Sequence, residues 1–151
     1  METRDTHMAD STHHEGGCLC GAVRYRATAQ PVRGVICHCA LCRRHSGAPA
    51  LAFVHFPKTA FAWVGAEPRW YRSSNYAERG FCATCGSTLG MREAALPDRV
   101  QVCVGSLDEP DRVRIDDHVW SASKLAWFEI DDHLPRFAQS STAVPSDALK
   151  P

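Results

Sequence analysis

Short runs in which hydrophobic and polar residues alternate dominate this chain. Few stretches show the i, i+3, i+4, i+7 spacing of an amphipathic helix, whereas β-branched and aromatic residues recur at alternate positions. Glycine, proline, asparagine and aspartate separate the runs. The pattern predicts strands at Ala22–Ala27, Arg33–Cys37, Ala50–Phe56, Phe61–Val64, Arg69–Arg72, Glu78–Phe81, Thr88–Met91, Arg99–Val104 and Val113–His118.

Helical turns are expected at two places, directly after Cys39 and around Ser121–Leu125. Many short strands at close spacing predict a mainly β protein with antiparallel strands. The length of 151 residues suits one domain, which we place at residues 16–137. The polar N-terminal segment 1–15 and the Ser-, Ala- and Pro-rich C-terminal segment 138–151 are expected to be flexible tails.

The charge balance gives no electrostatic signal for a nucleic-acid or membrane partner. Lys plus Arg and Asp plus Glu each number 17, so the formal net charge is +0. No apolar run approaches the ~20 residues that span a bilayer, and the N-terminus lacks the apolar core of a secretory signal. We therefore expect a cytoplasmic protein in a reducing environment, where disulfides are rare. The sequence does not specify an oligomeric state.

The cysteines carry the strongest chemical signal. Of the eight cysteines, seven fall into three tight groups. Cysteines separated by one or two residues, next to glycines, are typical of turns that direct their sulfurs at one metal ion. The groups are Cys18 with Cys20, Cys37 with Cys39 and Cys42, and Cys82 with Cys85.

A division into four plus three accounts for these seven residues. The two pairs together supply the four thiolates of a structural zinc site. We call Cys18, Cys20, Cys82 and Cys85 the cysteine quartet. Three protein ligands with an exchangeable fourth position are typical of catalytic zinc. The remaining group, the cysteine trio, consists of Cys37, Cys39 and Cys42.

Spacing alone leaves other interpretations open. Disulfides would also use an even number of cysteines, and the pairs can be combined differently. His45 or Cys103 would close the shell of the trio if either supplied a fourth ligand, and both sites would then be structural. Cys103 lies between two valines in a strand-like run, which also fits a buried, inert thiol.

Four segments together resemble a known family. They are "GGCLCGAVRY", "CHCALCRRHSG", "FCATCGSTL" and "DDHVWSASKLAWFEIDDHLPRF". In content, order and spacing they resemble the glutathione-dependent formaldehyde-activating enzyme family, also called the Gfa or centromere protein V family. The resemblance covers Glu15 to Phe137, and its last segment includes His118 and Trp120.

The resemblance implies a β-tent zinc-binding fold, with a structural zinc on the quartet and a second, more labile zinc on the trio. It further implies a carbon–sulfur lyase that joins formaldehyde to glutathione, giving S-(hydroxymethyl)glutathione. Two other functions stay open. One is a non-catalytic zinc module for protein contacts, and the other is a zinc enzyme of this fold that acts on a different small electrophile.

In this interpretation the zinc on the trio activates the thiol of glutathione as it attacks a small aldehyde. The carboxylates of glutathione need basic partners, for which Arg43, Arg44 and Lys124 are candidates. His45 is a candidate proton relay, whereas His38 is expected to lie at the surface or to contact the metal ligands without binding the metal.

Overall fold

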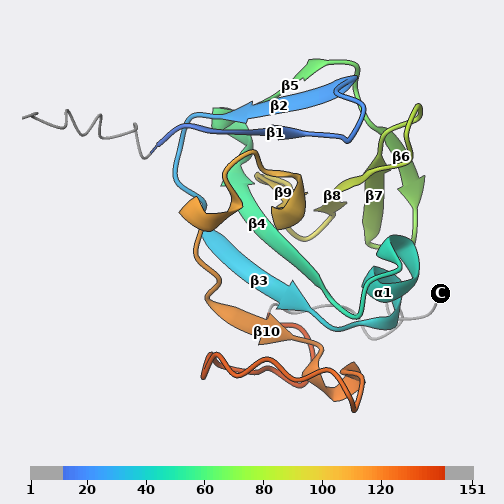
Figure 1. Cartoon of the computed structure of the whole chain (residues 1–151), viewed down its shortest axis with the longest axis vertical. Helices are drawn as coiled ribbons and strands as arrows, with labels where there is room; N and C mark the ends of the chain where they lie inside the picture. Colours follow the sequence, from blue (N-terminus) through green and yellow to red (C-terminus); the bar gives the residue numbers. More distant parts are fainter. Residues whose placement is uncertain (1–11, 142–151) are drawn as a thin grey trace, which may run out of the picture.

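Two β-sheets make up the structure, a computed structural model that describes residues 12–141 (Figure 1). The smaller sheet has three strands in the order β1-β2-β5, and the larger has seven in the order β10-β3-β4-β9-β8-β7-β6. Neighbouring strands are antiparallel except β10, which runs parallel to β3. The predicted mainly β class is therefore confirmed.

The strands are β1 (His14–Gly17), β2 (Val23–Ala27), β3 (Arg33–Cys37), β4 (Leu51–Pro57), β5 (Phe61–Gly65), β6 (Arg69–Arg72), β7 (Ala77–Phe81), β8 (Thr88–Glu93), β9 (Arg99–Cys103) and β10 (Asp117–Val119). The α-helix in the described residues is α1 (Ala40–Ser46), and single 3-10 turns cover Lys58–Ala60, Val104–Ser106, Pro110–Arg112 and Ser121–Ser123. Within residues 12–141, no helix has the length and hydrophobicity to cross a lipid bilayer.

Eight of the nine predicted strands agree with β2 to β9 to within two residues at each end, and both predicted helical turns are present. The prediction for Val113–His118 is wrong over most of its length, because β10 begins only at Asp117. The segment before it curves closely over β3. The amide of Gly34 donates to Asp116 Oδ2 at 2.9 Å, and a Cβ at Gly34 would lie 2.0 Å from the Arg114 carbonyl oxygen.

The predicted tails are too long at both ends. His14 and Glu15 belong to β1, which pairs with β2, and the two glycines of this strand hid its signal. At the other end, the carbonyl oxygens of Ala138 and Gln139 accept hydrogen bonds from the segment that follows β10. Residues 1–11 and 142–151 of the predicted tails lie outside the described residues.

The large sheet has two buried faces with different partners. On one face, Val54, Phe56 and Val102 pack against Tyr25 of the small sheet and against Leu107. The opposite face carries a second core, in which residues of β3, β4 and β9 pack with two cysteines of the trio. Its buried members are Val35, Cys37, Cys42, Phe53, Ala77, Met91, Cys103 and Val119.

A row of mostly polar side chains crosses this second face. Directly opposed residues on neighbouring strands point to the same side of a sheet. Through successive pairings the row runs Arg33, His55, Gln101, Met91 and Arg79. His55, Gln101 and Arg79 are buried, which is costly unless the groups are partnered or used. The row therefore indicates that this face has a role besides packing.

His55 makes the stability of the fold sensitive to acid. Burial, followed by the charges of Arg33 and Arg99, lowers the pKa of His55 to about 3. In the unfolded chain the pKa is about 6.5, so below this pH the unfolded state binds a proton that the folded state does not. The free energy of unfolding should fall by up to about 1.4 kcal/mol per pH unit from this residue alone.

The measurement is chemical denaturation of wild type and His55→Gln between about pH 6.5 and pH 5. The variant should lose less stability over this window than the wild type. His133→Gln is the matched control, because this imidazole is 89% exposed. Parallel curves for wild type and His55→Gln would contradict the prediction.

Candidate metal centres and their surroundings

The cysteine quartet comes together from two loops that are far apart in the sequence. Cys18 and Cys20 lie between β1 and β2, and Cys82 and Cys85 lie in the turn between β7 and β8. The Sγ atoms of Cys18 and Cys20 are 3.6 Å apart, and those of Cys20 and Cys82 are 3.8 Å apart. Tetrahedral zinc with Zn–S bonds near 2.3 Å places its sulfurs about 3.8 Å apart, so the four donors fit this metal.

Both loops direct backbone amides at the sulfurs. The amide of Val23 donates to Cys18 Sγ at 3.2 Å, and those of Thr84 and Cys85 donate to Cys82 Sγ at 3.4 and 3.5 Å. The turn after Cys85 requires glycine, because Gly86 has a left-handed φ of 77°. These amides stabilise thiolates, as a metal site requires.

The cysteine trio surrounds the junction of β3 and α1. Cys37 ends β3, Cys39 is the N-cap of α1, and Cys42 lies in its first turn, where its amide donates to Cys39 Sγ at 3.3 Å. The three sulfurs lie within 4.8 Å of one another, and neither His45 nor Cys103 belongs to this group. All eight cysteines are free, so no disulfide forms. The trio thus offers three protein ligands.

The close spacing of the three thiols of the trio favours a bound cation. Hydrogen bonds from Cys37 and Cys42 lower the pKa of Cys39 to about 2. A hydrogen bond from Cys37 also lowers the pKa of Cys42, but the hydrogen bond with Cys39 and burial outweigh it and raise the pKa to about 11. The charge of one thiolate therefore opposes ionisation of the others. A divalent cation would allow all three to ionise together, so this donor set fits zinc.

Arg79 brings a buried positive charge to the trio. Its side chain is 1% exposed, and it donates from Nη1 to Cys42 Sγ at 3.2 Å and from Nε to Ser73 Oγ at 3.2 Å. Burial alone would lower the pKa of Arg79, but the Cys42 sulfur outweighs it and raises the pKa above its usual value. The guanidinium thus stays charged and offsets negative charge on the cysteines.

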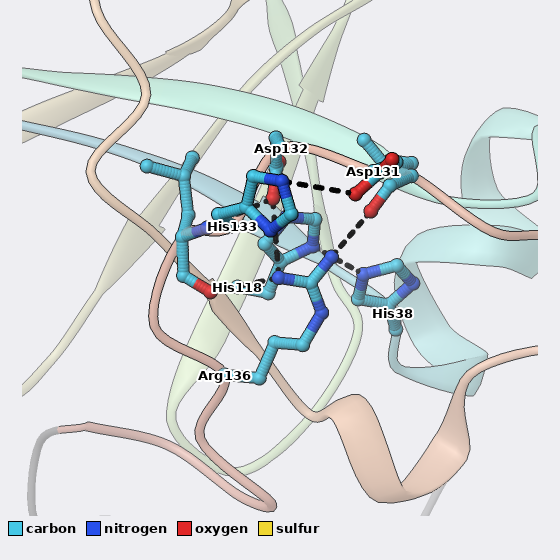
Figure 2. Close-up of polar contacts among 8 residues, drawn as sticks. His38, His118, Asp131, Asp132, His133 and Arg136 are labelled. Atoms are coloured by element: carbon cyan, nitrogen blue, oxygen red, sulfur yellow. Dashed lines mark hydrogen bonds and ion pairs between the residues drawn. The ribbon is translucent and has the colours of Figure 1, made fainter.

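A chain of hydrogen bonds holds the loop between Cys37 and Cys39 (Figure 2). His38 Nε2 lies 2.8 Å from His118 Nδ1, and His118 Nε2 lies 2.6 Å from Asp132 Oδ2. Burial opposes ionisation of Asp132, but hydrogen bonds from His118, Leu134 and Arg136 lower its pKa to about 2. The carboxylate therefore accepts from His118, and His118 in turn accepts from His38. His38 is buried, so the alternative of a surface histidine is wrong.

A small cavity of about 50 Å³ opens beside the trio. All three cysteines and Arg79 line it, together with His55 and Gln101 of the polar row. Tyr76, Trp120, Phe53 and Met91 form its apolar walls. A space of this volume holds one or two water-sized molecules, so it suits a very small reactant.

The other candidate residues do not line this cavity. Lys124 Nζ is engaged with the carbonyl oxygens of Leu125 and Phe128, at 2.9 and 3.2 Å, and with Glu129 Oε1 at 2.8 Å. The Nε of Arg43 and the Nε2 of His45 are buried without a hydrogen-bond partner, and Arg44 is exposed on α1. Cys103 is buried, and burial raises its pKa to about 12, as expected for an inert thiol.

Sequence reasoning missed Arg79, Asp132 and the polar row. In "AERGF" the arginine lies between a glutamate and a glycine, which is typical of a strand that faces solvent. Only the fold shows that it points at Cys42. Asp132 lies in a loop with other charged residues, where nothing distinguishes it from a surface carboxylate.

The comparisons with known proteins agree on one family. The family model described as glutathione-dependent formaldehyde-activating enzyme matches residues 13–123. A putative glutathione-dependent formaldehyde-activating enzyme of Halomonas elongata is 30% identical over 131 residues, covering 78% of this chain and 80% of the relative. An uncharacterized lyase of Schizosaccharomyces pombe is 37% identical over 76 residues, or 50% of this chain; the match spans only about half of that relative, 55%.

A solved structure has a similar fold. The crystal structure of a Rhodobacter sphaeroides protein superposes with a TM-score of 0.50 at 26% identity, covering 62% of this chain and 87% of that chain. The family match includes every cysteine of the quartet and the trio, whereas Asp132 and Arg136 lie beyond it. The chain belongs to the glutathione-dependent formaldehyde-activating enzyme family.

Proposed function

We propose that the protein is a zinc enzyme that joins a thiol, glutathione or a similar compound, to formaldehyde or another small aldehyde. The thiol sulfur forms a bond to the carbonyl carbon, the C=O double bond becomes a single bond, and the thiol proton ends on the oxygen. The observation that carries this proposal is a group of three cysteines, with no fourth protein ligand among residues 12–141, on the wall of a cavity of about 50 Å³.

The two cysteine groups would have different roles. The quartet would hold a structural zinc, because its four thiolates complete a tetrahedron and join loops 62 residues apart. The trio would hold the second zinc, which supplies a positive centre that lowers the pKa of an incoming thiol and fixes its sulfur.

The surrounding side chains would stabilise the negative charge of a fourth sulfur, that of the incoming thiol, next to the trio. Arg79 offsets charge on Cys42 through its hydrogen bond, which matters more because the guanidinium is buried. The hydrogen-bonded chain behind His38 holds the loop between two of the cysteines. The aromatic and aliphatic walls keep the cavity small, so a one-carbon carbonyl fits and bulky aldehydes do not.

Serine substitutions in the two groups should have different consequences. Cys82→Ser should lose the structural zinc and unfold, since metal binding contributes roughly 10 kcal/mol or more to folding in such sites. Cys39→Ser should keep the fold and one zinc, yet lose thiol–aldehyde addition by at least about 100-fold. Zinc content and thermal unfolding measure the difference, with Cys103→Ala as a control that retains both zinc ions. Unfolding of Cys39→Ser to the same extent as Cys82→Ser would contradict the assignment of a structural role to the quartet and a catalytic role to the trio.

The activity itself is measured as formation of S-(hydroxymethyl)glutathione above the spontaneous reaction. The wild type should accelerate addition of glutathione to formaldehyde. Arg79→Gln should lower kcat by roughly 10- to 100-fold, because a buried charge partner of the thiolates is lost. Zinc content and unfolding of this variant are the controls. A wild-type rate equal to the uncatalysed rate, at full zinc occupancy, would favour a non-catalytic zinc module instead.

A further inference from the structure

A second and much larger cavity adjoins the small one. It has a volume of about 660 Å³, within the range that holds a ligand of tripeptide size. Trp63 of β5 and Trp70 of β6 form part of its wall, which continues onto β8, β9 and the turn between them. The two cavities share three lining residues, Tyr76, Glu93 and Leu96. We call the larger cavity the groove.

Tyr76 connects the groove with the metal-binding residues. Its side chain is half-buried and packs against the core that contains Cys37 and Cys42. The same residue lines both cavities, so it lies at the boundary between the groove and the trio. A thiol on a flexible stem could therefore reach past Tyr76 while the rest of the molecule stays in the groove.

The groove concentrates unpaired positive charge. Lys58, Arg72 and Arg99 line it, and among the described residues none of the three has a carboxylate within ion-pair distance. Outside the groove, most of the described arginines form ion pairs with carboxylates. Arg92, also in the groove, bonds to Glu78 and lies 4.2 Å over the Trp70 ring.

Two acids line the groove without an ion-pair partner among the described residues: Glu93, which accepts a hydrogen bond from Gln101 Nε2 at 2.9 Å, and Glu67. An unpaired carboxylate beside three unpaired cations is complementary to a molecule that carries several carboxylates and one ammonium group.

We propose that the groove binds the peptide part of the thiol substrate, with Arg72 and Arg99 holding its carboxylates and Glu67 its ammonium group. The occupant is a peptide thiol with two carboxylates and one ammonium, which rests on the proposed function for the identity of the reaction. This assignment replaces Arg43, Arg44 and Lys124, which line neither cavity.

Size and charge together support this occupant. The small cavity cannot hold a tripeptide, whereas the groove can. Guanidinium groups bind carboxylates with two parallel hydrogen bonds, and the indole walls give the peptide an apolar surface. Substrates without carboxylates would gain nothing from Arg72 and Arg99, so the groove would determine which thiols the enzyme prefers.

The first test measures binding without catalysis. S-methylglutathione keeps the carboxylates and the ammonium but has no thiol proton, and calorimetry gives its dissociation constant. Arg72→Gln and Arg99→Gln should each weaken binding roughly tenfold. Arg69→Gln is the matched control, because Arg69 is an exposed arginine on the same strand, β6, that does not line the groove. Equal binding by wild type and all three variants would overturn the inference.

The second test measures substrate preference. The ratio of kcat/KM for glutathione to that for 2-mercaptoethanol, which has no carboxylate, should fall roughly tenfold in Arg72→Gln and Arg99→Gln and stay constant in Arg69→Gln. If the wild type binds S-methylglutathione through these arginines but catalyses no addition, the inference stands and the proposed function fails. If it catalyses addition with the same ratio in all three variants, the proposed function stands and the inference is wrong.

Discussion

Convergence of cysteine sulfurs from distant loops is the constraint on which the rest of the structure depends. The sulfurs of Cys20 and Cys82 lie 3.8 Å apart although 62 residues separate them in the sequence. Like-charged thiolates at this distance repel one another, so the arrangement favours a bound cation. Because the quartet lies where both sheets meet, a metal there would fix the small sheet relative to the large one.

The second face of the large sheet shows how a β protein can carry charge in its interior. Arg79 is buried, but Cys42 and Ser73 accept its hydrogen bonds, and sulfur charge offsets its own. Beside this face, His38 and His118 are equally buried and are linked to the carboxylate of Asp132. Arg79 and His118 thus each have specific hydrogen-bond partners, whereas Nδ1 of His38 has none in the described part of the chain. Arg79 of β7 and the chain from His38 to Asp132 therefore approach the trio from different parts of the fold.

Sequence reasoning reached the strands and the cysteine groups because both signals are local. Alternation and turn residues determine most strand positions, and close cysteine spacing marks metal-binding turns. Sequence reasoning failed where the residues in contact are far apart in the sequence. Nothing in "AERGF" reveals that Arg79 meets Cys42, 37 residues earlier, whereas Arg43 and Arg44 are candidates only through their position next to Cys42 in the sequence. β1 was missed because its two glycines resemble a turn.

The central claim is that the trio holds zinc with a fourth position that a thiol can occupy. X-ray absorption at the zinc edge, recorded on the full chain with both sites loaded, tests this most directly. The average shell should contain an oxygen or nitrogen ligand, and adding glutathione should replace it with sulfur. Shells that contain only sulfur before glutathione is added, or that do not change afterwards, would contradict the account.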